Sequence, residues 1–333
     1  MGPVICAIGR AENHALLRFH ANALGVGYIA LDGEDARLII NGKLKLHSII
    51  QEVFPDYDRH RPPILTTIDS STRPESMRSL IATSQKTFQL PLSLQGNLDL
   101  LETFESPQSP RSLEELERQE QLGHLEEFDS RYAITVVRSP HGQISLWPVI
   151  EISHDGALTP VDEVRRTPAL DSLLQEVQTL AVERKLVGAL TFVASKDGAI
   201  LLREWGLTPL SLWSEHACHT TVAEQLVRAF VDLPLGQTQI ITENERYLEE
   251  VVDLIEHSRT LSERLGKERR NLAELLDDPT RPFLHLFARN PKLKVSYEDQ
   301  ARHRVKIAVY ADSEAKAQEE LEHAKDFMAG FDL

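Results

Sequence analysis

Residues 132–150 read YAITVVRSPHGQISLWPVI, and residues 189–205 read ALTFVASKDGAILLREW. Each stretch holds two apolar, β-branched runs with a short polar turn between them. The turn is Ser139 to Gly142 in the first stretch and Lys196 to Gly198 in the second. Two apolar runs that flank such a turn predict an antiparallel hairpin. The two stretches therefore predict an antiparallel sheet in the middle of the chain.

Helices are predicted around these hairpins from the spacing of apolar residues. Thr167 to Leu186 carries leucine and valine at helical spacing, which predicts an amphipathic helix on the sheet. Ala217 to Val231 is predicted as a second helix. Glu243 to Leu276 shows a further apolar stripe of helical period, and we expect one helix there, broken at Gly266. This stripe could serve core packing, dimer packing or a partner surface.

The N-terminal third has the order of an open α/β unit. The apolar run Pro3 to Gly9 is followed by a helical pattern that stops at Gly25, and Val26 to Leu31 is a second apolar run. Leu44 to Phe54 is predicted as a helix, and Ile64 to Asp69 as a strand. This order predicts parallel strands joined by helices. Only one glycine follows the first strand, whereas a dinucleotide-binding turn uses three, which favours a plain strand-to-helix turn.

The remaining segments are predicted as a connector, an intervening helix and a terminal unit. Residues 102–129 are acidic and contain two Ser-Pro steps, which is typical of a solvated connector, with an acidic docking arm as the alternative. Helices are predicted at Glu75 to Thr83 and from Ser112 onward. Strands are expected around Phe283 to Ala288 and Val305 to Tyr310. A last helix is expected from Ser313 to Ala329.

Composition and charge exclude several classes of partner. The 333 residues include 36 Lys and Arg and 51 Asp and Glu, a formal net charge of −15. Phosphate backbones and anionic lipids repel such a chain, so we expect no nucleic acid and no membrane partner. The two cysteines, Cys6 and Cys218, form no CxxC pair, and no apolar run reaches a membrane span. These features predict a cytoplasmic protein without a disulfide framework.

His216, Cys218 and His219 form a compact group of metal-ligating residue types. His216 and His219 could share a helix face, and Glu215 lies one helical turn before His219. Two histidines and a thiol could hold zinc, but no clear fourth ligand stands nearby. We favour a histidine pair at a helix start, without metal.

The order of elements resembles a known enzyme family. The first hairpin, the helix, the second hairpin and then VAEQLVRAFVDLPLG at residues 222–236 are similar to the ATP-grasp carboxyaminoimidazole ribonucleotide synthetases. The similarity is clearest from Phe128 to Gly236. It implies a Rossmann-like domain at residues 1–100, an ATP-grasp-like core at residues 128–280 and a small strand–helix domain at residues 281–333. It also implies a homodimer.

The chain departs from this family where the family binds nucleotide. The family's two lysines and glycine-rich loop precede the core, whereas residues 101–127 here contain no Lys and a single glycine, Gly123. These residues are interpreted as an acidic connector that replaces the nucleotide-gripping subdomain. The family's ribose-binding Glu falls on Arg131. Cations that offset charge on a transferred phosphoryl group are essential to such ligation, so their loss argues against it.

The family's metal and acceptor positions have changed as well. Its two metal-site acids fall on Thr191 and Glu204, so one carboxylate survives, and the Asn beside them falls on Arg203. The acceptor loop is shortened to GLTPLSLW at residues 206–213, and a lysine of the family's tail falls on Arg289. The residues that remain as candidates for a ligand cleft, with Glu204 as a weak metal ligand, are Arg203, Trp205, Arg289 and Lys294.

Three hypotheses follow for the function. The leading one is a diverged, non-catalytic homologue that acts as a scaffold, a regulatory partner or a small-ligand binder, as a homodimer or with another protein, and without a cofactor. The alternative is an active ATP-grasp ligase with a rebuilt site, which would use ATP and Mg²⁺. The third is a metal-dependent activity at the histidine cluster.

Overall fold

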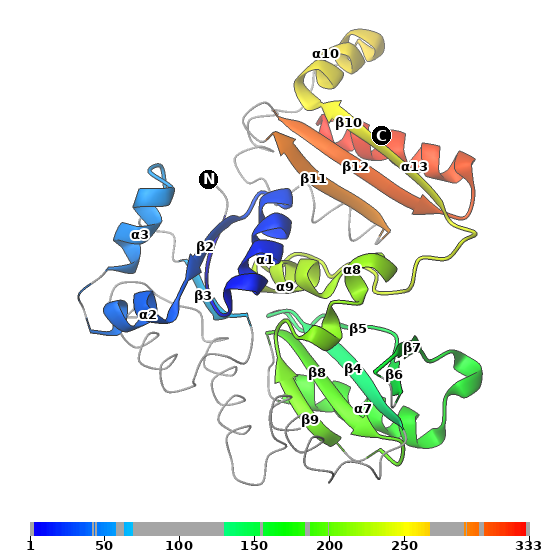
Figure 1. Cartoon of the computed structure of the whole chain (residues 1–333). Coiled ribbons are helices and arrows are strands. Elements are labelled where there is room, and N and C mark those ends of the chain that lie inside the picture. The colour runs from blue at the N-terminus through cyan, green and yellow to red at the C-terminus, as the bar shows by residue number, and fades with distance from the viewer. Residues whose placement is uncertain are drawn as a thin grey trace.

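The computed structural model describes residues 3–41, 43, 45–57, 63–68, 130–153, 156–183, 187–198, 200–266, 290, 292–299 and 303–330. These residues form three sheets with helices packed on them (Figure 1). The strands are β1 (Val4–Ile8), β2 (Gly27–Leu31), β3 (Ile64–Thr67), β4 (Ser130–Arg138), β5 (Ile144–Leu146), β6 (Ile150–Ser153), β7 (Leu158–Pro160), β8 (Gly188–Ser195), β9 (Ile200–Trp205), β10 (Arg246–Asp253), β11 (Leu293–Asp299) and β12 (Arg304–Ala311). The helices are α1 (Ala11–Ala23), α2 (Gly33–Ile40), α3 (Leu46–Val53), α7 (Pro168–Glu183), α8 (Ser214–Ala217), α9 (Val222–Phe230), α10 (Leu254–Leu265) and α13 (Glu314–Met328), with 3₁₀ turns η1 (Glu163–Arg165) and η2 (Pro209–Ser211).

The N-terminal sheet is parallel, with strand order β2-β1-β3. Ile5 of the central strand pairs with Tyr28 on one side and with Ile64 on the other. All five residues of β1 are buried, as expected for a parallel strand covered on both faces. The predicted strand–helix–strand opening is thereby confirmed. The sequence did not predict α2, which Asp32 caps by accepting hydrogen bonds from the N–H groups of Glu34 and Asp35.

The central sheet is antiparallel, in the order β7-β6-β4-β8-β9, with β5 also paired to β4. Both predicted hairpins are present, and β4 and β8 join them through pairs such as Val137 with Ala189. The second apolar run of the stretch 132–150, Ile144 to Ile150, is predicted as the returning strand of the first hairpin, but in the structure it is divided into β5 and the start of β6. Pro148 lies in the gap, where its missing N–H removes a ladder donor.

The C-terminal sheet has the order β10-β12-β11 and is antiparallel, with α13 packed on it. The prediction of helix from Glu243 is wrong for Arg246–Asp253, which pair residue by residue with β12 as strand β10. Apolar residues at Tyr247, Leu248, Val251 and Val252 fit a helical stripe, but pairing with β12 decides the local structure. The helix begins only after Asp253, and Gly266 ends it at φ 60°, which confirms the expected break.

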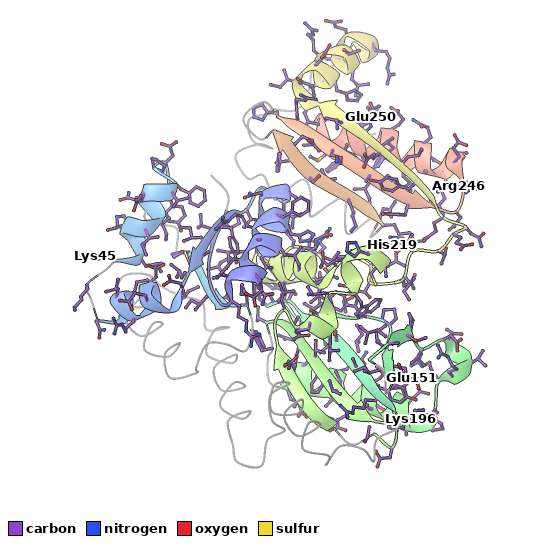
Figure 2. All side chains as sticks on the ribbon, in the orientation of Figure 1. Lys45, Glu151, Lys196, His219, Arg246 and Glu250 are labelled. Atoms are coloured by element: carbon purple, nitrogen blue, oxygen red, sulfur yellow. The ribbon has the colours of Figure 1, made fainter. Side chains whose placement is uncertain are left out.

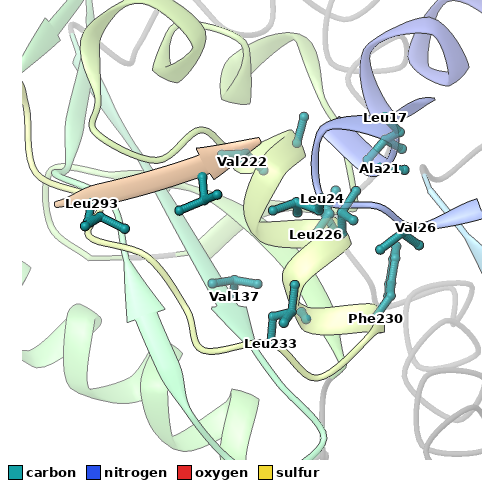
Figure 3. Close-up of a cluster of buried hydrophobic side chains, with 14 of the residues drawn as sticks. Leu17, Ala21, Leu24, Val26, Val137, Val222, Leu226, Phe230, Leu233 and Leu293 are labelled. Atoms are coloured by element: carbon teal, nitrogen blue, oxygen red, sulfur yellow. The ribbon is translucent and has the colours of Figure 1, made fainter. Parts of the chain in front are cut away.

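Helix α9 joins the three sheets. It packs against α1 of the N-terminal part and against β4 and β8 of the central sheet, and α1 also contacts β11 (Figure 1). Apolar side chains from all three parts meet there in one buried cluster (Figure 3). Its members include Leu17, Ala21, Val137, Leu226, Phe230 and Leu293.

The predicted fold class is confirmed: an α/β chain with a Rossmann-like start, an antiparallel sheet with helices, and a small C-terminal strand–helix part. The terminal helix and the strand at Val305 to Tyr310 are also confirmed, and β11 is a strand that the sequence did not predict. Four predicted segments lie outside the described residues: the connector at 101–127, the helices expected at 75–83 and from 112, and the strand expected at 283–288. Domain boundaries stay predictions. Within the described part, no helix is long and apolar enough to cross a membrane.

Candidate functional site

The face of the central sheet turned away from α7 carries Thr191 and Glu204, the two residues that the sequence comparison placed at the family's metal site. Thr135 of β4, Thr191 of β8 and Glu204 of β9 stand opposite one another in successive strands, so their side chains share a face. The hydroxyl groups of Thr135 and Thr191 are 3.0 Å apart and buried. Two residues along each strand, Val137 and Ala189 belong to the apolar cluster shared with α9. This row therefore lies beside the junction of the three sheets.

The row does not fit a Mg²⁺ ion. Mg²⁺ is bound through carboxylate and phosphate oxygens in near-octahedral geometry, and Glu204 is the single carboxylate of these three residues. The two threonine hydroxyls hydrogen-bond to each other. Among the residues that the structure describes, no group of three or more His, Cys, Asp or Glu is placed to hold a metal ion.

Of the four ligand-cleft candidates, the structure describes the side chains of Trp205 and Lys294, which lie in different surroundings. Trp205 is fully buried and packs in the core under α7, on the face opposite Glu204. The backbone of Arg203 pairs with Phe192, whereas its side chain and the whole of Arg289 lie outside the described residues. Lys294, on β11, forms an ion pair at the junction.

The junction contains a buried ionic cluster centred on Glu224 of α9. Arg228, one helical turn later and fully buried, donates from Nε at 2.9 Å and from Nη2 at 2.5 Å to Oε1 of Glu224. Nζ of Lys294 donates to Oε2 at 3.0 Å. Burial alone would raise the pKa of Glu224, but the charges of Lys294 and Arg228 outweigh it and hold that pKa far below its ordinary value.

The same helix clamps the loop that follows it. The side-chain amide of Gln225 donates to the carbonyl of Gly236 at 2.7 Å and accepts from the Gly236 N–H at 2.9 Å. Arg228 donates to the carbonyl of Pro234 at 3.1 Å. Gln225 and Arg228 of the motif at 222–236 therefore hydrogen-bond to the backbone of the same motif. A structural role accounts for these two polar side chains.

A second charged cluster surrounds His219, the residue labelled between the C-terminal sheet and α8 in Figure 2. Its Nε2 lies 3.1 Å from Oε2 of Glu245, and Lys292 pairs with the same carboxylate. The prediction of a histidine pair at a helix start is wrong. His216 is exposed in α8, which ends at Ala217, and His219 is buried in the link between α8 and α9.

Glu215 also contacts a different partner from the expected one. Its Oε2 lies 3.4 Å from Nε2 of His20 on α1, and the Thr221 hydroxyl lies 3.3 Å from the same nitrogen. Helices α1, α8 and α9 are therefore linked by polar contacts as well as by apolar packing. Sequence reasoning missed Glu224 and Arg228, although a carboxylate four residues before an arginine on a helix is a recognisable signal.

Comparison with known proteins gives a consistent result. No family model matches the chain. Over 118 residues it is 36% identical to the N5-carboxyaminoimidazole ribonucleotide synthase of Mycobacterium leprae (strain TN), which covers 32% of this chain and 26% of that protein. The same enzyme of Bacillus subtilis (strain 168) is 33% identical over 125 residues, covering 34% of this chain and 32% of that protein. The matches thus span about a third or less of the curated relatives' length.

Solved structures carry the same name. The N5-carboxyaminoimidazole ribonucleotide synthetase of Thermus thermophilus aligns with a TM-score of 0.48 and 17% identity, over 99% of both chains. That of Thermotoga maritima aligns with a TM-score of 0.48 and 15% identity, over 97% of this chain and 98% of the other. Over about a third of its length, the chain resembles the N5-carboxyaminoimidazole ribonucleotide synthases in sequence, as its motifs predicted.

Proposed function

We propose that this protein is a strongly diverged homologue of the N5-carboxyaminoimidazole ribonucleotide synthases that lacks ATP-dependent ligase activity and acts as a scaffold, regulatory partner or small-ligand binder. The sequence similarity to the curated synthases supports the ancestry. The replacement of one metal-site acid by Thr191 and the absence of lysine from residues 101–127 support the loss of ligation.

The observation that carries the proposal is the mutual neutralisation of charge at the junction. Arg228 and Lys294 are both bound to Glu224, and Lys292 is bound to Glu245. A phosphate that recruited these cations would leave a buried carboxylate uncompensated, at a cost of several kcal/mol. The arrangement is that of a structural core, since its cations already have partners inside the protein.

Isothermal titration with ATP and Mg²⁺ tests the proposal. We expect no measurable heat of binding and no rise in melting temperature. A ligand that did bind only the native state would stabilise it by about 2.7 kcal/mol at one hundred times its Kd, which a melting curve would detect. The Bacillus subtilis synthase, titrated in parallel, is the positive control. A micromolar Kd for this chain would contradict the proposal.

The second candidate function is an active ligase with a rebuilt site, which Glu204 favours as the surviving acid of the family's metal pair. This candidate requires ATP and Mg²⁺, and its test is release of ADP in the presence of bicarbonate and 5-aminoimidazole ribonucleotide. Glu204→Gln should abolish such turnover without lowering the melting temperature. The described residues do not fit the metal, so we rank this candidate second.

Assembly and location belong to the same proposal. We propose a homodimer, by analogy with the family, and a cytoplasmic protein. Both cysteines are buried thiols, and burial raises the pKa of each to about 12. Protonated, buried thiols fit a reducing compartment, in which no disulfide is needed.

A further inference from the structure

His219 lies where the C-terminal unit, defined as β10, β11, β12 and α13, contacts the rest of the protein. Its backbone N–H donates to the carbonyl of Gln239 at 3.0 Å, which fixes the residue in the link between α8 and α9. Its ring stacks edge-on against Tyr310 of β12, with ring centroids 4.6 Å apart. Its Nε2 meets Glu245, which immediately precedes β10 and pairs with Lys292 beside β11. The imidazole of His219 therefore contacts β12 directly through Tyr310. Through Glu245 it is also linked to the start of β10 and to Lys292, just before β11.

The hydrogen bonding of this ring suits its neutral form. A carboxylate only accepts hydrogen bonds, so the Nε2 facing Glu245 carries the proton. The other ring nitrogen, Nδ1, is buried and has no hydrogen-bond partner among the described residues. A second proton would make Nδ1 a donor without an acceptor in a side chain that is 1% exposed. Such a buried, unsatisfied donor costs free energy in the closed arrangement.

The charges around the ring do not favour a further proton. The positive charges of Lys292, just before β11, and Lys294, on β11, act on the ring, and Glu245 is the facing acid, already shared with Lys292. Glu224, on α9, is committed to Arg228 and Lys294. Burial lowers the pKa of His219, the charge of Glu245 raises it, and the two lysines lower it; the net direction is down.

The neighbouring groups that could titrate do not change charge near neutral pH. Burial raises the pKa of the Cys218 thiol to about 12, and the pKa values of Tyr310 and Tyr247 are raised as well. Burial opposes ionisation of Glu245, but its hydrogen bonds to Lys292 and the Thr242 N–H outweigh this and lower its pKa. Between pH 7.5 and 5.5, His219 is therefore the member of this cluster whose protonation can change.

We propose that His219 is a pH-sensitive latch that holds the C-terminal unit on α8 and α9 while the imidazole is neutral and releases it when the imidazole is protonated. The direction of the pH effect follows from which arrangement, open or closed, gives the ring the higher pKa. In the open arrangement the ring reaches water and regains an ordinary pKa of about 6.5, whereas the closed arrangement disfavours the second proton. The latch is at full strength above that pH and weakens as the pH falls below it. The open fraction should rise about tenfold from pH 7.5 to pH 5.5, as one proton taken up on opening requires.

Hydrogen–deuterium exchange of the full chain at pH 7.5 and 5.5 tests the latch, with rates corrected for intrinsic exchange. We expect a roughly tenfold increase in opening at Gln239 to Asp253 and in β11 and β12, with β1 and β2 unchanged. His219→Gln keeps a donor toward Glu245 but cannot titrate, so this increase should disappear. His216→Gln, which changes an exposed histidine three residues away, should behave like wild type. An unchanged pH response in His219→Gln would overturn the proposal.

A measurement on the unmodified chain covers the case in which His219→Gln fails to fold. Proton and carbon NMR of the histidine ring follows the protonation of His219 directly. We expect its protonation to accompany the opening of the C-terminal unit. Protonation of His219 while β10 and β12 remain fully protected from exchange would show that the ring is no latch.

Discussion

Glu224 is the residue at which the charges between α9 and β11 meet. It lies on α9, is 7% exposed, and receives hydrogen bonds from Arg228 on its own helix and from Lys294 on β11. A carboxylate this deeply buried is tolerated because both of its oxygens are bound by cations. The residue thereby ties the C-terminal sheet to the helix at the centre of the molecule.

Removing this carboxylate should be costly. Glu224→Ala leaves Arg228 and Lys294 without their counter-charge at a buried site, and we expect a loss of about 3–5 kcal/mol in the free energy of unfolding. Urea denaturation followed by circular dichroism measures it. Glu34→Ala, which removes an exposed partner of Arg37, is the control and should have no measurable effect. Equal stabilities of the two variants would show that the buried cluster contributes nothing.

The same residue predicts a response to acid. The pKa of Glu224 is lowered in the folded protein from an ordinary value of 4.5, so its contribution is complete above that value and is lost as the pH falls below it. We expect the stability difference between wild type and Glu224→Gln to be widest above pH 5 and to narrow by pH 3. Urea titrations at pH 6, 4 and 3 measure this difference. A difference that stays constant with pH would mean that the carboxylate has an ordinary pKa.

At the scale of single elements, the strand β8 depends on a glycine at its start. Gly188 has φ +122°, and a Cβ there would lie 3.0 Å from Cζ2 of Trp205 and 3.3 Å from Cε1 of Phe230. Both the backbone conformation and the packing therefore require glycine.

Gly188→Ala should lower the free energy of unfolding by about 2 kcal/mol or more, because strain and overpacking act together. Thermal denaturation provides the measurement. Gly33→Ala is the matched control: this glycine begins α2 and has nothing within 4 Å of its Cβ position, so the change should be neutral or slightly stabilising. A melting temperature of Gly188→Ala equal to that of the control would contradict the packing argument.

The elements also show which parts of the structure the sequence could predict. Hairpins with strong turn residues, such as Lys196 to Gly198, and the helix under the central sheet follow from local pattern alone. Arg246–Asp253 could not be assigned in this way. Its apolar spacing suits a helix, and only the distant strand β12 makes it extended. Trp205 and Glu204 are neighbours along β9, and successive side chains of a strand point to opposite faces of the sheet. The sequence alone could therefore have predicted that these two residues do not share a face.

At the scale of the whole molecule, the fold class was predictable because the order of strands and helices fixes it. The junction was not, because its charge pairs join residues far apart in the sequence, such as His20 with Glu215 and Glu224 with Lys294. Motif comparison pointed to Glu204 and its neighbours on β9. The ionic cluster joins Glu224 and Arg228, which lie within the motif at 222–236, to the candidate Lys294, and the resemblance gave no sign that these residues pair.

The assembly state is the prediction that belongs to this scale. We expect a homodimer, with a mass in solution twice the 37.6 kDa of one chain. Light scattering at low micromolar concentration measures it directly, and the monomeric variant of a known dimer of similar size serves as a mass reference. A single species of 37.6 kDa would contradict the analogy with the family.

The packing of α1 against α9 has a consequence for synthesis on the ribosome. Leu17 and Ala21 of α1 share a buried cluster with Leu226 of α9, which is made about 200 residues later. At roughly 5–20 residues per second, the apolar face of α1 waits some 10–40 seconds for its partner. The central sheet, built from neighbouring hairpins, can form in that interval. Nascent chains that end before α9 should therefore be the species that most need a chaperone.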